Sequence, residues 1–266
     1  MPINIIVCAK QVIDPETPVS AFKVDREAKR VVPAAGVPPV VNGFDENAME
    51  AALRLKEKAG GGKITVLSVG KSFVNDVIKK PLAMGGDDLI LVQEDAFEGL
   101  DAFATVKALA AAIKKIGQYD LVLCGRQASD YDQAHVAHGI AEMLGLPLIS
   151  MAANVEVKDG AIHVERKLSD GFEVLAAPMP AVVTVSNELA PVRLPNLRGI
   201  MGAARKQPTV WKAADIGLDA SALRSGLELL DLFIPVSEKV CEFIEGEDDE
   251  DKGRKLALRL REAKLI

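Results

Sequence analysis

The stretch CGRQASDYDQAHV, residues 124–136, combines several residue types that could bind a ligand. It follows an apolar run, enters a helical pattern, and contains Asp130, Asp132 and His135. The first amides of that helix, which we expect near residues 131–133, could receive a phosphate because they are unpaired and lie at the positive end of the helix dipole. The two aspartates could instead cap the helix. The residue types alone therefore indicate either a nucleotide-binding turn or a capped loop.

Motifs for a glycine-rich phosphate loop and for catalysis do not occur in the sequence. VGKS at residues 69–72 lacks the upstream glycine of a Walker loop, and neither GxGxxG nor G-x-S-x-G is present. His135 and His138 lie three residues apart, but no third metal ligand has a suitable spacing. We therefore expect no catalytic residues and no metal site, and we favour a protein that binds a nucleotide.

Composition and charge argue against several classes of protein. The chain has 266 residues, with 32 Lys and Arg against 38 Asp and Glu and a formal charge of −6, so a nucleic-acid-binding surface is not expected. No apolar run approaches the length of a membrane span, and the first residues lack the pattern of a signal peptide. We expect a cytoplasmic protein of bacterial or archaeal type. Cys8, Cys124 and Cys241 are too far apart for a CxxC site, and we expect all three to be buried in strands.

Four short, almost continuous apolar runs predict parallel strands that are buried on both faces: NIIVCAK, KITVLSV, DLILVQ and YDLVLCG. Helical patterns at residues 45–61 and 100–117 lie between them, the first with Asp45 as its expected N-cap. Strands that alternate with helices indicate a doubly wound, mostly parallel, Rossmann-like α/β sheet. Ligands of such sheets bind at the carboxyl ends of the strands, where we expect VCAKQ, SVGKS and the 124–136 stretch to converge.

Three regions with different sequence patterns come after these strands and helices in the chain. Period-two alternation with two Asp-Gly pairs predicts antiparallel hairpins near residues 151–177, within a nucleotide-binding domain that spans residues 1–190. Residues 191–234 contain LPNLRGIMGAARK and an irregular segment. Residues 235–266 join an acidic linker to an amphipathic helix with Leu256 and Leu260 on one face, which suggests a docking arm.

Several blocks of the sequence, taken in order, resemble the β subunit of electron transfer flavoproteins, the family that includes FixA. They are VCAKQVIDPET, VNGFDENAMEAALRLKE, LAMGGDD, LVLCGRQASDYDQAHVAHGIAEMLGLPLIS, PMPAVVTV and LPNLRGIMGAARK. The resemblance covers nearly the whole chain. It implies a heterodimer with an α subunit, FAD carried largely on α, and an adenine nucleotide buried in β. It also implies an electron carrier, and not an enzyme, that takes electrons from flavin dehydrogenases of the acyl-CoA class.

The resemblance also implies site residues. The family's nucleotide pocket falls on Cys8, Ala9, Asn42, Asp45, Val69, Asp130, Asp132, Gln133, Ala134, His135 and Val136. Phe44 and residues 13–15 would face the flavin bound by α. The family's dehydrogenase-recognition loop matches residues 195–201 and places its anchor at Leu197, and the C-terminal helix would embrace α.

Departures from the family pattern leave two cofactors open. The family commonly has glutamine at the position of His135 and threonine or cysteine at the position of Gln133, and NGFD replaces the frequent NPFD. AMP is the first expectation for the pocket. A second FAD that reacts with NADH, as in family members that split electron pairs between two acceptors, is the alternative. A nucleotide-binding regulatory module without redox function is a third interpretation.

Overall fold

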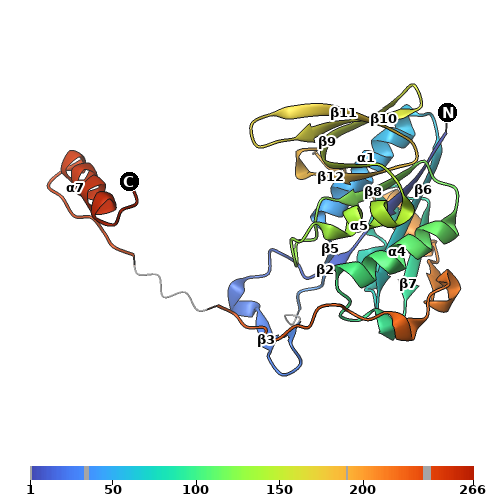
Figure 1. The fold of residues 1–266 in the computed structure, drawn as a ribbon, viewed down its shortest axis with the longest axis horizontal. Coiled ribbons are helices and arrows are strands. Elements are labelled where there is room, and N and C mark those ends of the chain that lie inside the picture. The colour runs from blue at the N-terminus through green and yellow to red at the C-terminus, as the bar shows by residue number, and fades with distance from the viewer. Residues whose placement is uncertain (1, 33–35, 190, 236–240) are drawn as a thin grey trace. The chain divides into compact units, whose positions relative to one another are not determined.

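The computed structural model describes residues 2–32, 36–189, 191–235 and 241–266 (Figure 1). The chain forms two compact units, residues 1–231 and residues 232–266, and each is described by itself. The first unit contains the whole sheet and every helix except the last.

The main sheet of the first unit has nine strands. They are β1 (Ile3–Cys8), β6 (Gly62–Gly70), β7 (Asp88–Gln93), β8 (Leu121–Gly125), β9 (Leu148–Lys158), β10 (Ala161–Lys167), β11 (Phe172–Pro178), β12 (Ala181–Val185) and β13 (Thr209–Trp211). Two small antiparallel pairs lie outside it, β2 (Gln11–Val12) with β5 (Val40–Val41) and β3 (Lys23–Asp25) with β4 (Arg30–Val32). The helices of this unit are α1 (Gly43–Lys58), α2 (Asn75–Ile78), α3 (Lys80–Met84), α4 (Ala102–Ile116), α5 (His135–Leu144) and α6 (Leu197–Arg205).

The strand order is β11-β10-β9-β12-β8-β1-β6-β7-β13. Every pairing from β9 to β13 along this order is parallel, which confirms the predicted doubly wound α/β fold. From β1 the chain first builds outward through β6 and β7. It then returns to the other side of β1 to form β8, so the order reverses between β1 and β8.

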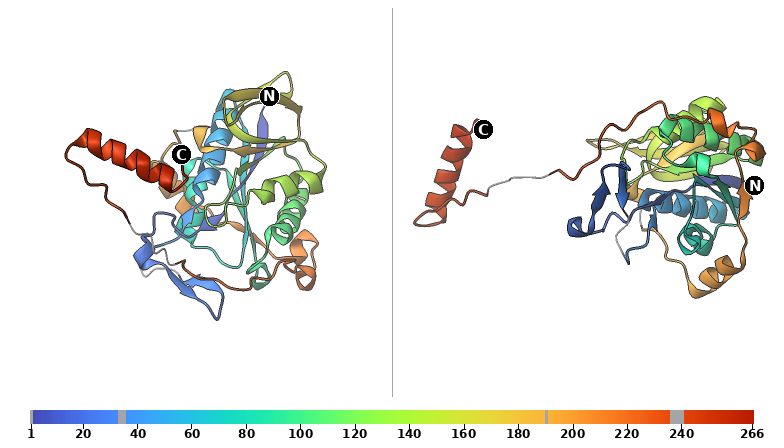
Figure 2. Two further views of the ribbon diagram at one scale, coloured as in Figure 1. Left: turned by 60° about the vertical axis from the view of Figure 1, so that its left-hand side comes forward. Right: turned by 90° about the horizontal axis from the view of Figure 1, so that it is seen from below.

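Helices cover both faces of the sheet (Figure 2). Alternate residues of β1 show the two layers: Ile5 and Val7 pack in the core under α1, whereas Ile6 and Cys8 pack in the core under α4 and α5. Burial on both faces explains why the apolar runs of β1, β6, β7 and β8 are continuous and do not alternate with polar residues.

The predicted hairpins extend this sheet. Asp159 and Gly160, both with positive φ, make the turn between β9 and β10, and the second Asp-Gly pair lies between β10 and β11. Both strand pairs are antiparallel. The residues between these strands therefore form the tight turns that their sequence predicted.

Residues 191–231 are more regular than expected. α6 packs against α3, and β13 pairs with β7 and adds a strand to the edge of the sheet. β13 has only three residues, so its sequence pattern is too short to predict a strand. It is a strand because it pairs with β7. Cys241 is exposed and lies outside any strand, which corrects the expectation that all three cysteines are buried.

The second unit contains one helix, α7 (Asp249–Glu262), the red helix of Figure 1. Asp248 caps it by accepting a hydrogen bond from the Asp251 amide. None of the described residues of α7 is buried, and Leu256 and Leu258 are about half exposed. Residues 236–240 of the arm predicted over 235–266 lie outside the described residues.

Candidate nucleotide site

The candidate site lies where the strand order reverses. β1 pairs with β6 on one side and with β8 on the other, all parallel, so their carboxyl ends meet at one edge of the sheet. This confirms that VCAKQ, SVGKS and the 124–136 stretch converge. Ser68 ties two of these ends together, because its hydroxyl donates a hydrogen bond to the Ala9 carbonyl at 2.7 Å. Open α/β sheets hold their ligands at this topological position.

Asp45 connects the first turn of α1 to both central strands. Its carboxylate accepts a hydrogen bond from the Lys10 amide at 2.8 Å and another from the Gly125 amide at 3.0 Å. Burial raises the pKa of Asp45 to about 7, although these hydrogen bonds act to lower it. A Cβ atom on Gly125 would lie 2.4 Å from an Asp45 carboxylate oxygen, so this close approach requires glycine.

Asn42, and not Asp45, is the N-cap of α1. Its side-chain amide donates to the Gln127 carbonyl at 2.8 Å, and its side-chain oxygen accepts from the Ser129 amide at 3.2 Å. Asn42 is buried, with 1% of its surface exposed. The residue therefore holds the loop after β8 against the start of α1, and the expectation that Asp45 caps the helix is wrong because tertiary partners take up its carboxylate.

Charged side chains form the outer rim of the site. The Lys10 ammonium contacts both carboxylate oxygens of Asp130, at 2.8 and 2.7 Å. Gln127 donates to Asp132 at 2.7 Å. The ion pair offsets the negative charge of Asp130, which would otherwise repel a bound phosphate.

α5 begins at His135, a few residues later than expected, and Asp130 and Asp132 do not cap it. The residue before it, Ala134, has a left-handed conformation with φ 57°, and no side chain caps the first turn. Asp132 also has a positive φ of 51°. These turns delay the helix start and leave its first amides without a side-chain acceptor, so they can meet an anion.

The floor of the site is apolar. Cys8, Val69, Cys124 and Val136 belong to one core cluster on the α4 and α5 face. The hydrogen bond with Cys8, together with burial, raises the pKa of the Cys124 thiol, so Cys124 serves here as a small apolar residue. Such a surface can contact a flat base without competing hydrogen bonds.

The structure thus brings together most residues that the sequence assigned to the pocket, although their roles in binding stay a prediction. Cys8, Ala9, Asn42 and Asp45 are buried beneath it, and Val69, Ala134 and Val136 are half-buried around it. Asp130, Asp132, Gln133 and His135 are exposed. Phe44 lies to one side, where the Arg126 guanidinium is 4.9 Å from its ring centroid.

Leu197 lies apart from this site, at the first position of α6. It is 73% exposed and forms an apolar ridge with Leu194, Ile200 and Met201, which are 84%, 51% and 51% exposed. Asn196 caps the helix by accepting from the Gly199 amide at 2.9 Å. Exposed apolar side chains gathered at the start of one helix are typical of a protein-binding surface.

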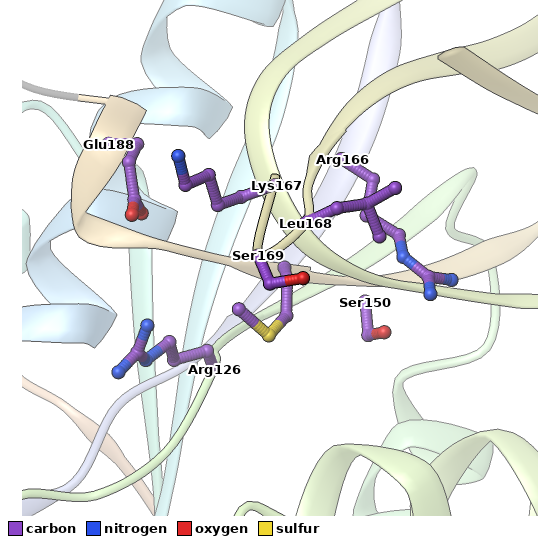
Figure 3. Close-up of a pocket in the computed structure, with 8 residues that line it drawn as sticks. Arg126, Ser150, Arg166, Lys167, Leu168, Ser169 and Glu188 are labelled. Atoms are coloured by element: carbon purple, nitrogen blue, oxygen red, sulfur yellow. The ribbon is translucent and has the colours of Figure 1, made fainter. Parts of the chain in front are cut away.

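A separate cavity of about 510 Å³ lies beside the candidate site (Figure 3). Its polar lining, labelled in the figure, consists of Arg126, Ser150, Arg166, Lys167, Ser169 and Glu188. The Nε atom of Arg126 is buried and has no hydrogen-bond partner within the described structure. The charged residues of its lining are three cations and one carboxylate. Arg126 directly precedes Gln127, at which Asn42 holds the loop after β8.

Sequence reasoning missed Lys10, Ser68, Gln127 and Arg126. Lys10 reads as an ordinary surface lysine, because its contacts with Asp45 and Asp130 are 35 and 120 residues away in the chain. Only the position of these residues at strand ends could have indicated them. Among the described residues, no three His, Cys, Asp or Glu side chains form a possible metal site, and no helix has the length and apolar character of a membrane span.

By class, the chain is a doubly wound α/β protein with a candidate nucleotide site at the switch point of a parallel sheet. Residues 30–216 match the family described as the electron transfer flavoprotein domain. On this match and the relatives below, the chain belongs to the electron transfer flavoprotein family, as a β-type subunit.

Three relatives illustrate the match. The electron transfer flavoprotein subunit beta of Thermoanaerobacterium thermosaccharolyticum is 40% identical over 221 residues, which cover 83% of this chain and 82% of that one. The subunit beta of Megasphaera elsdenii is 38% identical over 259 residues, 94% of each chain. The caffeyl-CoA reductase-Etf complex subunit CarD of Acetobacterium woodii is 35% identical over 266 residues, 99% of this chain and 100% of that one.

Proposed function

We propose that this chain pairs with an electron transfer flavoprotein α subunit and carries electrons from flavin dehydrogenases of the acyl-CoA class to a downstream acceptor. In this proposal FAD, which supplies the redox chemistry, is held mainly by α. The site between β1 and β8 holds an AMP that has a structural role. The chain itself carries out no catalytic step.

The observation that carries this proposal is the uncapped first turn of α5 above an apolar floor. Its free amides suit a phosphate, and the cluster of Cys8, Val69 and Val136 suits an adenine. Asp132, exposed at the rim, can accept a hydrogen bond from a ribose hydroxyl. Asn42 and Asp45 have their polar atoms engaged by backbone amides and a carbonyl, so their role in this proposal is to hold the binding loops in place.

The apolar ridge and the separate second unit favour an electron carrier over a regulatory module. A module that only sensed a nucleotide would need neither feature. The ridge is the docking surface that we assign to the dehydrogenase, with Leu197 as its anchor.

The cavity beside Arg126 favours a second candidate, in which this subunit holds a second FAD that reacts with NADH. The cavity adjoins the nucleotide loop, and its cationic lining of Arg126, Arg166 and Lys167 suits the anionic remainder of a dinucleotide. AMP would leave the cavity open.

The test uses the heterodimer, co-expressed and purified with its α subunit. Bleaching of the flavin absorbance by an acyl-CoA dehydrogenase with butyryl-CoA, and not by NADH alone, is the result that we expect. Bleaching by NADH alone would favour the second candidate. If neither reductant bleached the flavin, the electron-carrier proposal would be wrong.

A further inference from the structure

The apolar ridge is held rigidly although its side chains are exposed. The segment just before it is bonded to α1, at Glu50, Arg54 and Glu57. Glu50 is buried, with 3% of its surface exposed. A buried carboxylate is costly unless hydrogen-bond donors offset the loss of its hydration. The donors to Glu50 therefore show which groups hold this part of the chain in place.

Arg193 supplies most of that compensation. Its backbone amide and its Nε atom both donate to one Glu50 oxygen, at 3.1 and 2.8 Å, and its Nη2 atom donates to the other at 3.1 Å. The same guanidinium also contacts the Glu57 carboxylate. Burial alone would raise the pKa of Glu50, but the hydrogen bonds from Arg193 and Arg54 lower it below its ordinary value.

Arg54 completes the attachment. It donates to Glu50 at 2.8 Å through Nε, and its other nitrogens donate to the carbonyls of Leu189 and Pro191 at 3.1 and 2.7 Å. The backbone therefore meets α1 at residues 189, 191 and 193, and the exposed Leu194 follows at once.

The far end of the ridge is anchored as well. A Cβ atom on Gly199 would lie 2.2 Å from the Ala83 carbonyl oxygen, so α6 lies directly on the backbone of α3. The Lys206 ammonium then donates to the carbonyls of Gly86 and Asp87, at 3.1 and 2.6 Å. Anchors on both sides leave the apolar side chains exposed on a fixed backbone, which lowers the ordering cost of docking.

We propose that Arg193 is a positioning residue for dehydrogenase docking: its bridge to Glu50 and Glu57 ties the segment that leads into the apolar ridge to α1, and so holds the ridge in the geometry that a partner binds. The inference rests on the proposed function, because the ridge must be the docking surface. Arg193 itself need not touch the partner.

The test compares Arg193→Gln and Arg193→Lys with a control, Lys58→Gln, in the purified heterodimer. Lys58 belongs to the same helix but pairs with Glu156. Hydrogen–deuterium exchange is measured first. Steady-state reduction of the heterodimer by an acyl-CoA dehydrogenase with butyryl-CoA, at varied heterodimer concentration, then gives kcat and the KM of the dehydrogenase for the heterodimer.

We expect Arg193→Gln to raise amide exchange across residues 194–205 at least tenfold. It should raise KM at least fivefold, with kcat changed less than twofold. Arg193→Lys should be intermediate, because it keeps the charge but loses the planar fork that bridges two carboxylates. Lys58→Gln should match the unaltered protein.

Unchanged exchange and unchanged KM in Arg193→Gln would overturn the inference. A fall in kcat or flavin content without a change in KM would also overturn it, because that result marks a general structural role. If Arg193→Gln does not fold, Glu57→Gln removes only the exposed part of the bridge, and the same readouts decide.

Leu197→Ala separates this inference from the proposed function. If Leu197→Ala left KM unchanged, the apolar ridge would not be the docking surface, and that part of the proposed function would be wrong. A KM that rises in Leu197→Ala but not in Arg193→Gln would overturn only the positioning role.

Discussion

Asp45 is a buried carboxyl group that holds two backbone amides at the switch point. Because burial raises its pKa to about 7 in the folded chain, from an ordinary value of 3.8, the folded state binds the proton more tightly than the unfolded state. The contribution of Asp45 to stability is therefore fully present below about pH 4. It is lost as the pH rises through 7.

The Asp45→Asn variant tests this contribution. We expect the unaltered protein to lose stability from this residue by about 1 kcal/mol per pH unit between pH 4 and pH 7, and the variant to lack that component. At pH 4 the variant should be about 2 kcal/mol less stable than the unaltered protein, because one backbone amide would face an NH2 group, and this deficit should vanish by pH 8, where only the unaltered protein has a buried charge. Urea unfolding of the heterodimer at several pH values measures both effects. An identical pH slope in the two proteins would contradict the raised pKa.

At the scale of elements, the start of α5 stores strain next to the site. Ala134 has a left-handed backbone, which costs a residue with a Cβ atom roughly 1–2 kcal/mol, whereas glycine adopts it readily. Since glycine loses more entropy on folding, we expect Ala134→Gly to raise the free energy of unfolding by about 0.5 kcal/mol.

Ala137→Gly is the matched control for this prediction. Ala137 lies inside the same helix and is buried, so glycine there should lower stability by about 1 kcal/mol. Urea unfolding of both variants measures the change in the free energy of unfolding, which should be positive for Ala134→Gly and negative for Ala137→Gly. If Ala134→Gly were as destabilising as the control, the left-handed start of α5 would be wrong.

The sequence predicted elements whose patterns are local. Continuous apolar runs defined β1, β6, β7 and β8, and the Asp-Gly pairs defined the turns around β10. Features that depend on distant partners were missed. Asn42 stands at the N-cap position of α1, but its side chain bonds Gln127 and Ser129. Asp45 bonds the amides of Lys10 and Gly125, and no local pattern contains that information.

The candidate site shows the same limit. Its composition could be predicted, because the strand ends of a parallel sheet must meet. The ion pair between Lys10 and Asp130 and the late start of α5 could not, because both follow from how the loop after β8 packs on α1.

At the scale of the whole molecule, the chain divides into two compact units. Residues 1–231 contain the complete sheet and the candidate site, whereas residues 232–266 contain a helix with none of its described residues buried. An amphipathic helix without a buried face of its own needs a partner to cover it.

We therefore expect a chain that ends at residue 234 to keep its fold but to lose the α subunit. Far-UV circular dichroism should show the secondary structure of the first unit, and co-purification with tagged α should fall at least tenfold. The full-length chain is the control. Equal recovery of α by both chains would exclude the second unit as the main attachment.

The central claim, that this subunit holds an adenine nucleotide between β1 and β8, is tested most directly by a count of released nucleotides. The purified heterodimer is denatured, and the nucleotides in the supernatant are identified and quantified. We predict one FAD and one AMP per heterodimer. Two FAD per heterodimer would favour the second candidate function, and one FAD with no further adenine nucleotide would contradict the site itself.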